Sequence, residues 1–215
     1  MFDKIIYPKS YVAWDLETTG LDPKINDILE IGVMVIENGE TTFEKSWMLN
    51  HNIEIPEIIT EITGINKEIV DREGINPSDA MREALNVLKF TNRDCPNLTH
   101  NGIRFDIDFF VTQATKNLGF NYNQSEELKN NIRGCAIDTA VMYKAKKMEM
   151  ERMWNESFID WSERVMRVIA RGVKYNVGIC CDELEISREG VVQHRALADV
   201  FLTNEIYKKL ICYNK

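Results

Sequence analysis

The sequence has little of what disulfide scaffolds, zinc sites and membrane proteins need. It contains five cysteines, an odd number, and none of them form a CxxC pair. This argues against a disulfide framework or a zinc site and favours a reducing compartment. The apolar stretch ILEIGVMVI is interrupted by Glu30 and is far too short to span a bilayer. The N-terminus lacks the apolar region of a secretory signal, so we expect a cytoplasmic protein with no membrane partner.

An excess of positive charge is also missing. Lys and Arg total 26 against 34 Asp and Glu, which leaves a net charge of −8. Such a chain is a poor candidate for non-specific coating of nucleic acid or anionic membrane. A nucleic-acid enzyme is not excluded, because bound divalent cations can neutralise a carboxylate-rich site.

There are no internal repeats, low-complexity tracts or Pro/Ser-rich linkers, so we expect residues 1–215 to form one domain. Strands are predicted first, joined in one place by the hairpin signal Asn38-Gly39. Short strands then alternate with helices, which predicts an α/β fold with a mixed sheet flanked by α-helices. The predicted strands are 11–15, 28–37, 41–50, 96–100 and 134–139.

The helical predictions follow apolar spacing and breakers. Residues 55–70 have helical spacing interrupted by Gly64, and 77–90 and a segment from about Phe105 form further helices. From Ala140 to about Ala170 we expect a long charged helical segment, an insertion at about 140–173 before the last motif. Shorter helices are predicted within 174–186 and within 194–210.

Two carboxylates lie at the predicted end of the first strand. In an extended backbone residues i and i+2 share a face, so Asp15 and Glu17 converge. Adjacent carboxylates repel each other unless a cation lies between them, and hard oxygen ligands favour Mg²⁺ or Mn²⁺. A bare DxE pair is more often simply solvated, but the apolar residues before this one favour a site at a sheet edge.

Two further motifs carry acids. HNGIRFD (100–106) follows a strand and leads into a helix, which places a side chain at the carboxyl end of a sheet. By itself Asp106 is equally explained as a helix-start acid. In HRALAD (194–199), five positions separate His194 from Asp199, too far apart in angle to share a helix face. The two can cooperate if His194 lies in the preceding loop and Asp199 one turn inside the helix.

In combination, DLETTG, HNGIRFD and HRALAD resemble the motifs of the DEDDh exonuclease superfamily. This DnaQ-like group includes the proofreading subunits of bacterial replicative polymerases. ILEIGVMVIENGE, ITEITGINKEIV, CAIDT and KYNVGICCDELEI resemble further family segments in the same order, so the resemblance covers about residues 10–205. It implies a ribonuclease H-like fold and a metal-dependent 3′–5′ exonuclease.

The resemblance also implies roles for individual residues. Two divalent ions, Mg²⁺ or Mn²⁺, would activate water and stabilise the leaving 3′ oxygen, with a neutral histidine as base. Leu21 matches the position where family members wedge an apolar side chain against the terminal base. The implied catalytic and metal-binding acids are Asp15, Glu17, Asp106 and Asp199, the histidine is His194, and the substrate-binding residues are Thr18, Leu21, Asn101 and Phe105.

Three other polar residues are interpreted as structural. We expect Glu30 to be held by a buried hydrogen bond near the site and His100 to support the second motif. Asp138 is interpreted as a structural acid rather than a fifth metal ligand.

The segment from Lys144 to Lys174 departs from the compact helix usual in the family. It has eight basic and five acidic residues, a local charge of +3. Such a run is either a solvated helix face with i,i+4 ion pairs or a surface that tracks phosphates or binds a partner. Trp154 and Trp161, seven apart, are expected to share a core-facing side.

The predicted function is therefore hydrolysis of terminal phosphodiesters of DNA, at single-stranded 3′ ends, with release of 5′-mononucleotides. An exoribonuclease that trims short or single-stranded RNA is the alternative, because no residue shows whether the 2′-hydroxyl is accepted. A catalytically silent binding module is a third reading. Expected partners are nucleic acid 3′ ends and a polymerase or another replication or repair protein.

Overall fold

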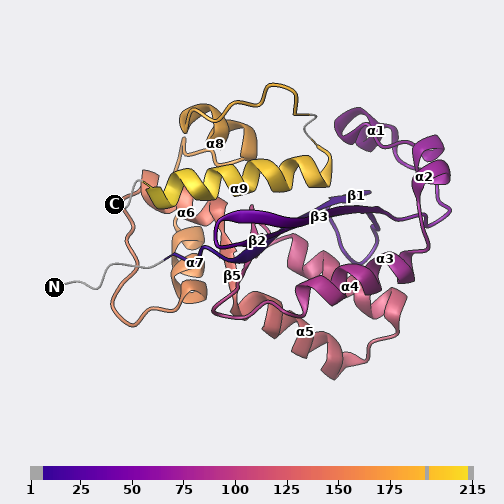
Figure 1. Cartoon of the computed structure of the whole chain (residues 1–215), viewed down its shortest axis with the longest axis horizontal. Helices are drawn as coiled ribbons and strands as arrows, with labels where there is room; N and C mark the ends of the chain where they lie inside the picture. Colours follow the sequence, from indigo (N-terminus) through magenta and orange to yellow (C-terminus); the bar gives the residue numbers. More distant parts are fainter. Residues whose placement is uncertain (1–6, 192–193, 213–215) are drawn as a thin grey trace.

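A single mixed sheet forms the centre of the molecule (Figure 1). The computed structural model describes residues 7–191 and 194–212. The strand order is β3-β2-β1-β4-β5, with β2 antiparallel to β1 and β3, and β4 parallel to β1 and β5. The strands are β1 (Tyr11–Thr18), β2 (Ile28–Glu37), β3 (Glu40–Met48), β4 (Asn97–Thr99) and β5 (Ala136–Asp138).

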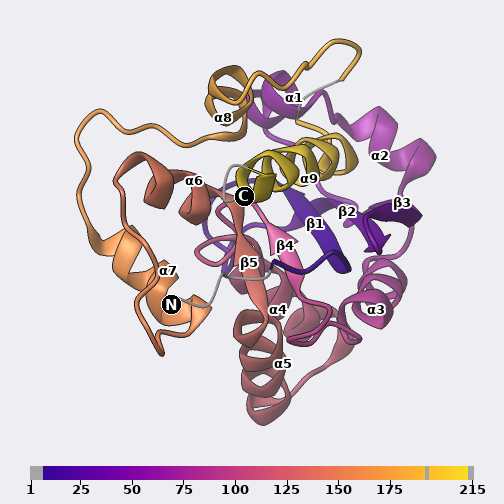
Figure 2. The same cartoon turned by 60° about the vertical axis from the view of Figure 1, so that its left-hand side comes forward.

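Helices cover both faces of this sheet (Figures 1 and 2). Within the described ranges they are α1 (Glu57–Thr63), α2 (Lys67–Glu73), α3 (Pro77–Leu88), α4 (Asp106–Leu118), α5 (Tyr122–Gly134), α6 (Thr139–Lys147), α7 (Phe158–Arg167), α8 (Val177–Glu183) and α9 (Ala196–Cys212). The mixed sheet flanked by helices confirms the predicted α/β, ribonuclease H-like fold class.

Alternation along β1 divides its side chains between two cores. Tyr11 and Ala13 belong to the core beneath α6–α9, whereas Val12 and Trp14 belong to the core shared with α3, α4 and α5. Because Asp15 continues the odd-numbered series, the backbone directs it toward the α9 face. The same alternation therefore builds the core and directs polar groups to one edge.

The sequence-based strands and the hairpin are confirmed. The turn between β2 and β3 contains Asn38 with φ 54° and Gly39 with φ 93°, the left-handed pair that a tight hairpin requires. The helical segment 55–70 divides at Gly64, whose φ of 71° ends α1. Gly64 therefore acts as the breaker that the sequence predicts.

The long helical segment expected from Ala140 to Ala170 is wrong in detail. Residues 148–157 between α6 and α7 are not helical. A separate helix, α7, begins after Ser157, whose hydroxyl accepts a hydrogen bond from the Asp160 amide. Trp154 is 76% exposed in this connection, whereas Trp161 is buried in α7, so the two do not share a face. The prediction was wrong because the charged pattern continues through residues 148–157, whereas the Ser157 cap starts a separate helix.

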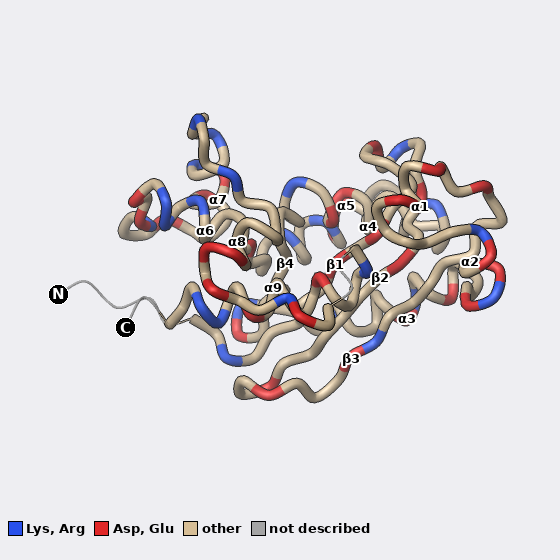
Figure 3. Tube along the Cα trace, turned by 90° about the horizontal axis from the view of Figure 1, so that it is seen from above, with Lys and Arg blue, Asp and Glu red and all other residues tan. Residues whose placement is uncertain are grey.

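Helix α7 carries charges of both signs, whereas the charged residues of α6, which are Lys144, Lys146 and Lys147, are all basic (Figure 3). Arg167 pairs with Glu163 at i,i+4, and Arg164 pairs with Glu156. Part of this segment is therefore an ion-paired face. Its description as an insertion within a single domain stays a prediction.

Helix α5 was not predicted. Its buried stripe is sparse, consisting of Ser125, Leu128 and Ile132. The usable signal was the capping box, in which Asn121 and Gln124 bond reciprocally to each other's backbone amides. None of the helices in the described ranges is long and apolar enough to cross a membrane.

Candidate active site

Three of the predicted acids meet at one edge of the sheet. Asp15 and Glu17 project from the end of β1, and Asp199 lies one turn inside α9. One carboxylate oxygen from each can be chosen so that all three lie within 4.8 Å of one another, and each residue is half-buried. Segments 184 positions apart in sequence, at Asp15 and Asp199, thus supply a single cluster of oxygen ligands.

A glycine brings α9 close enough to complete this cluster. Gly32 of β2 pairs with Asp15 across the ladder, and a Cβ at Gly32 would lie 2.5 Å from the carbonyl carbon of Ala196 and from the Leu197 amide nitrogen. No side chain fits at that separation. The first turn of α9 therefore packs directly on the strand backbone opposite Asp15, which places Asp199 beside it.

The fourth predicted acid, Asp106, lies beside this cluster but outside the group of three. It is the first residue of α4, is 4% exposed and accepts the backbone amide of Leu16. Among neighbouring charges, Asp106 has the largest effect on the pKa of Asp15. It is therefore an electrostatic neighbour of Asp15, held by a main-chain hydrogen bond.

The clustered carboxylates repel one another, and a bound cation would relieve this repulsion. Burial, followed by repulsion from the other acids, raises the pKa of Asp15 well above its ordinary range and that of Glu17 to about 8. Burial also raises the pKa of Asp199. The positive charge of Arg195 opposes the rise in the pKa of Glu17. Half-buried carboxylate oxygens in this arrangement fit Mg²⁺ or Mn²⁺, which would offset the repulsion.

In EDTA, the free energy of unfolding is expected to fall as pH rises from about 5 to about 8. The pKa of Glu17 is raised from 4.5 to about 8, and that of Asp15 is raised as well. The folded protein therefore holds protons that the unfolded chain has released, and this stabilisation disappears as pH passes the folded-state values. The midpoints of urea denaturation across this pH range measure the effect. Mg²⁺ should make the unfolding free energy less dependent on pH. Stability that rises with pH in EDTA would contradict it.

His194 occupies the position that the third motif required. It lies in the loop just before α9 with φ 61°, is exposed, and its backbone amide donates to the Asp199 carboxylate. The left-handed backbone turns the chain into the helix at this residue. His194 is thus linked to a cluster acid without sharing its helix face.

A buried ion pair fixes the start of α9. Glu30 of β2 is 1% exposed and accepts Arg195 Nε at 2.9 Å and Nη2 at 3.0 Å. The same carboxylate accepts the Ala196 amide at 3.2 Å and the Ser46 hydroxyl. The buried hydrogen bond expected at Glu30 is present, but its partner Arg195 was missed. The signal was an arginine directly after the motif histidine.

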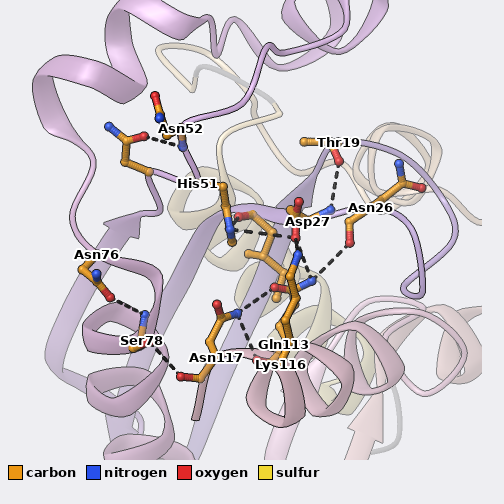
Figure 4. A network of polar contacts seen from close by, with 12 residues as sticks. Thr19, Asn26, Asp27, His51, Asn52, Asn76, Ser78, Gln113, Lys116 and Asn117 are labelled. Atoms are coloured by element: carbon orange, nitrogen blue, oxygen red, sulfur yellow. Dashed lines mark hydrogen bonds and ion pairs between the residues drawn. The ribbon is translucent and has the colours of Figure 1, made fainter. Parts of the chain in front are cut away.

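The loop that carries Leu21 is anchored at its ends (Figure 4). Thr19 and Asp27 exchange backbone and hydroxyl hydrogen bonds, and Asp27 also accepts Lys116 and Gln113 of α4. Leu21 itself is 85% exposed. An apolar side chain is thus presented to solvent from a fixed loop next to the end of β1.

The other predicted substrate-binding residues are more constrained. Thr18 is buried and its hydroxyl donates to the Gly20 carbonyl at 2.7 Å. Asn101 has φ 65° and is half-buried. Phe105 is half-buried against Phe109, with ring centroids 4.7 Å apart. At Phe105 only the outer part of the ring is free to touch a ligand.

Two buried polar residues support the second motif, as expected. Asp138 accepts the amides of Asn101 and Ile103 and caps α6. His100 contacts the Thr139 hydroxyl and the Tyr175 carbonyl. Both residues have their polar atoms engaged in holding the loop that ends at Asp106.

The fold and the acidic cluster define a class: a ribonuclease H-like protein of the DnaQ-like exonuclease type. More specifically, the sequence model described as exonuclease (RNase_T) matches residues 12–207, and the chain belongs to this family.

Similar proteins are longer. The PolC-type DNA polymerase III of Ureaplasma parvum is 28% identical over 200 residues, covering 93% of this chain and 11% of that protein. The 3′-5′ exonuclease DinG of Bacillus subtilis is 35% identical over 119 residues, covering 55% and 12%. The E. coli exonuclease I complex with a dA16 oligonucleotide superposes with a TM-score of 0.72 at 15% identity, covering 96% of this chain and 41% of that one. The last similarity concerns the fold alone.

Proposed function

We propose that this chain is a metal-dependent 3′–5′ exonuclease that acts on single-stranded 3′ ends of DNA. The observation that carries the proposal is the meeting of Asp15, Glu17 and Asp199 within 4.8 Å beside a strand end. Family membership supports the reaction class. The similar proteins named DNA polymerase III and 3′-5′ exonuclease, and the fold neighbour with bound dA16, support DNA as substrate.

The residues that would hold two divalent ions are the three clustered acids, with Asp106 as their neighbour. Bound ions would supply Lewis-acid activation of water and charge neutralisation at the departing 3′ oxygen. The chain's own contribution is to fix the oxygen ligands. Asp15 lies rigidly in β1, and Asp199 is held by the packing of α9 on Gly32.

His194 is assigned as the general base. Its imidazole takes a proton from the attacking water, and the resulting hydroxide displaces the 3′ oxygen of the penultimate nucleotide. The terminal P–O3′ bond breaks and a 5′-mononucleotide leaves. The exposed Leu21 is assigned to contact the terminal base, and Thr18, Asn101 and Phe105 to border the same nucleotide.

Replacing His194 with alanine should lower kcat by about 10² to 10⁴-fold, the usual contribution of a positioned base. The stabilisation of the protein by Mg²⁺ should remain, because the carboxylate cluster is intact. Single-turnover rates and melting temperatures with and without Mg²⁺ measure the two effects. Glu189→Ala, an exposed change in the same loop, is the matched control. Full activity in His194→Ala would refute the assignment.

The proposed function is tested with 5′-end-labelled single-stranded DNA and RNA of matched sequence. We expect loss of nucleotides from the 3′ end of DNA with Mg²⁺ or Mn²⁺, and none in EDTA. Faster trimming of RNA would replace the proposed substrate by the exoribonuclease alternative. Absence of cleavage together with tight binding would favour a silent binding module.

The similarity to PolC-type polymerases supports a further proposal, that the chain works with a polymerase or another replication or repair protein. Co-elution with a polymerase in size-exclusion chromatography is the direct test.

A further inference from the structure

Two cavities between α5 and α7 share one arginine. The first, of about 190 Å³, lies at the carboxyl ends of β4 and β5 and is lined by Ile103, Arg104 and Asp138. The second, of about 700 Å³, lies at the amino ends of the same strands, where Pro96 and Ala136 border it. Arg133, in the last turn of α5, lines both. Arg133 and its partner Glu163 therefore lie where the two cavities adjoin.

The first cavity is bordered by the loop that leads to Asp106. Arg104 lies two residues before Asp106, in the loop whose amides are held by Asp138. Arg104 is exposed and forms no ion pair with the described residues. Figure 3 shows Lys and Arg positions between α7 and α5, and Figure 2 shows α7 beside β5 and α5 below it, leading into the start of that strand.

The second cavity is basic although the chain is acidic overall. Three arginines, Arg93, Arg133 and Arg152, line it, and none of the described residues in its lining is acidic. Arg133 is fixed by Glu163 at 3.1 Å and by the Ile103 carbonyl at 3.3 Å. By contrast, neither Arg93 nor Arg152 is ion-paired within the part of the chain that the structure describes. Two guanidinium groups are thus available for an anionic occupant.

The remainder of this cavity is apolar. Pro8, Pro96, Ile137 and Phe158 line it, and the Phe158 ring packs edge-on against Trp161 at 5.2 Å. Its volume of about 700 Å³ exceeds the needs of one inorganic anion and falls in the range of ligand sites. The combination of planar guanidinium groups with apolar walls matches a phosphate ester that carries sugars and bases.

We propose that Arg104, Arg133, Arg152 and Arg93 form a basic track that binds the phosphodiester backbone of the substrate strand upstream of its 3′ end. The sugars and bases pack against the apolar wall of the second cavity. This inference rests on the proposed function, because the strand enters the track from the candidate active site. It also gives a role to Arg152 of the charged segment 144–174, in which Arg164 and Arg167 are ion-paired instead.

The test is a length ladder of single strands, from about three to about twenty nucleotides, as both DNA and RNA. The variant is Arg93→Ala/Arg152→Ala. The control is Arg82→Ala/Lys208→Ala, which removes two exposed positive charges on α3 and α9. For the longest strands the variant should bind about tenfold more weakly at unchanged kcat. Two lost phosphate contacts should also make the slope of log K against log salt shallower by about 1.4. The shortest strands should be unaffected.

Binding is measured by fluorescence anisotropy in EDTA, in parallel with degradation started by Mg²⁺, so that the two proposals fail separately. Equal binding and salt slopes in variant and control at all lengths would refute the track, even if wild-type protein degrades every strand. Arginine-dependent, length-dependent binding without degradation would keep the track and refute the exonuclease. Arg93→Lys/Arg152→Lys should keep most of the salt slope, because it keeps the charges.

Discussion

Replacing Asp15 with asparagine should reduce turnover at least about 1000-fold while making the metal-free protein more stable. Turnover falls because one of the three converging carboxylates is lost. Stability rises because the folded protein no longer holds a buried charge against Glu17, Asp106 and Asp199, the repulsion that raises the pKa of Asp15. A residue that only supports the fold would shift both quantities in the same direction.

Melting temperatures in EDTA and in Mg²⁺, together with single-turnover rates, test this prediction. Wild-type protein should gain about 2.7 kcal/mol of stability at a Mg²⁺ concentration of 100 times its Kd, and the variant much less. Asp108→Asn is the matched control, because Asp108 lies in the first turn of α4 but pairs with Lys129 and is not one of the clustered acids. A variant that is both active and less stable than wild type would overturn the assignment of the cluster.

Replacing Glu30 with alanine should cost about 1 to 3 kcal/mol of unfolding free energy, the loss typical of leaving a buried donor without its acceptor. The change leaves the Arg195 guanidinium and the Ala196 amide without their acceptor. Because these groups fix the start of α9, the positions of His194 and Asp199 should loosen too. Activity is therefore expected to fall further than stability alone accounts for.

Urea denaturation and kinetics at a temperature where the variant remains folded separate these two losses. Glu30→Gln keeps one acceptor oxygen for the Ala196 amide and should recover part of the stability. Ser46→Ala removes a single contact to the same carboxylate and is the mild control. If Glu30→Ala retained wild-type kcat in its folded form, the ion pair would serve the fold alone.

The elements that the sequence predicts well are those in which local pattern and burial agree. The β2 bounds, 28–37, were predicted without error, because apolar residues and the Asn38-Gly39 turn mark both ends. Alternation in β1 similarly predicts that Asp15 and Glu17 converge. Helix geometry also required His194 to lie in the loop before the last helix and Asp199 to lie inside it, and the structure places both residues in this way.

What the sequence could not predict depends on long-range packing. The contact between Glu30 and Arg195 joins positions 165 residues apart. The need for glycine at position 32 is visible only once α9 lies on it. The basic track could not be predicted for the same reason, since its four arginines come from four separate segments. The break at 148–157 was missed because a charged pattern outweighed the Ser157 cap.

The position of the three clustered acids in the sequence determines when the cluster forms during synthesis and folding. Asp15 and Glu17 are made early and Asp199 late, and Asp199 reaches them only when α9 has docked on Gly32. During synthesis, a chain that ends before α9 has two of the three clustered acids and no means of fixing a third. Such a chain lacks the third acid that the proposed metal site requires. Docking of α9 on β2 is therefore the last step in assembling the cluster.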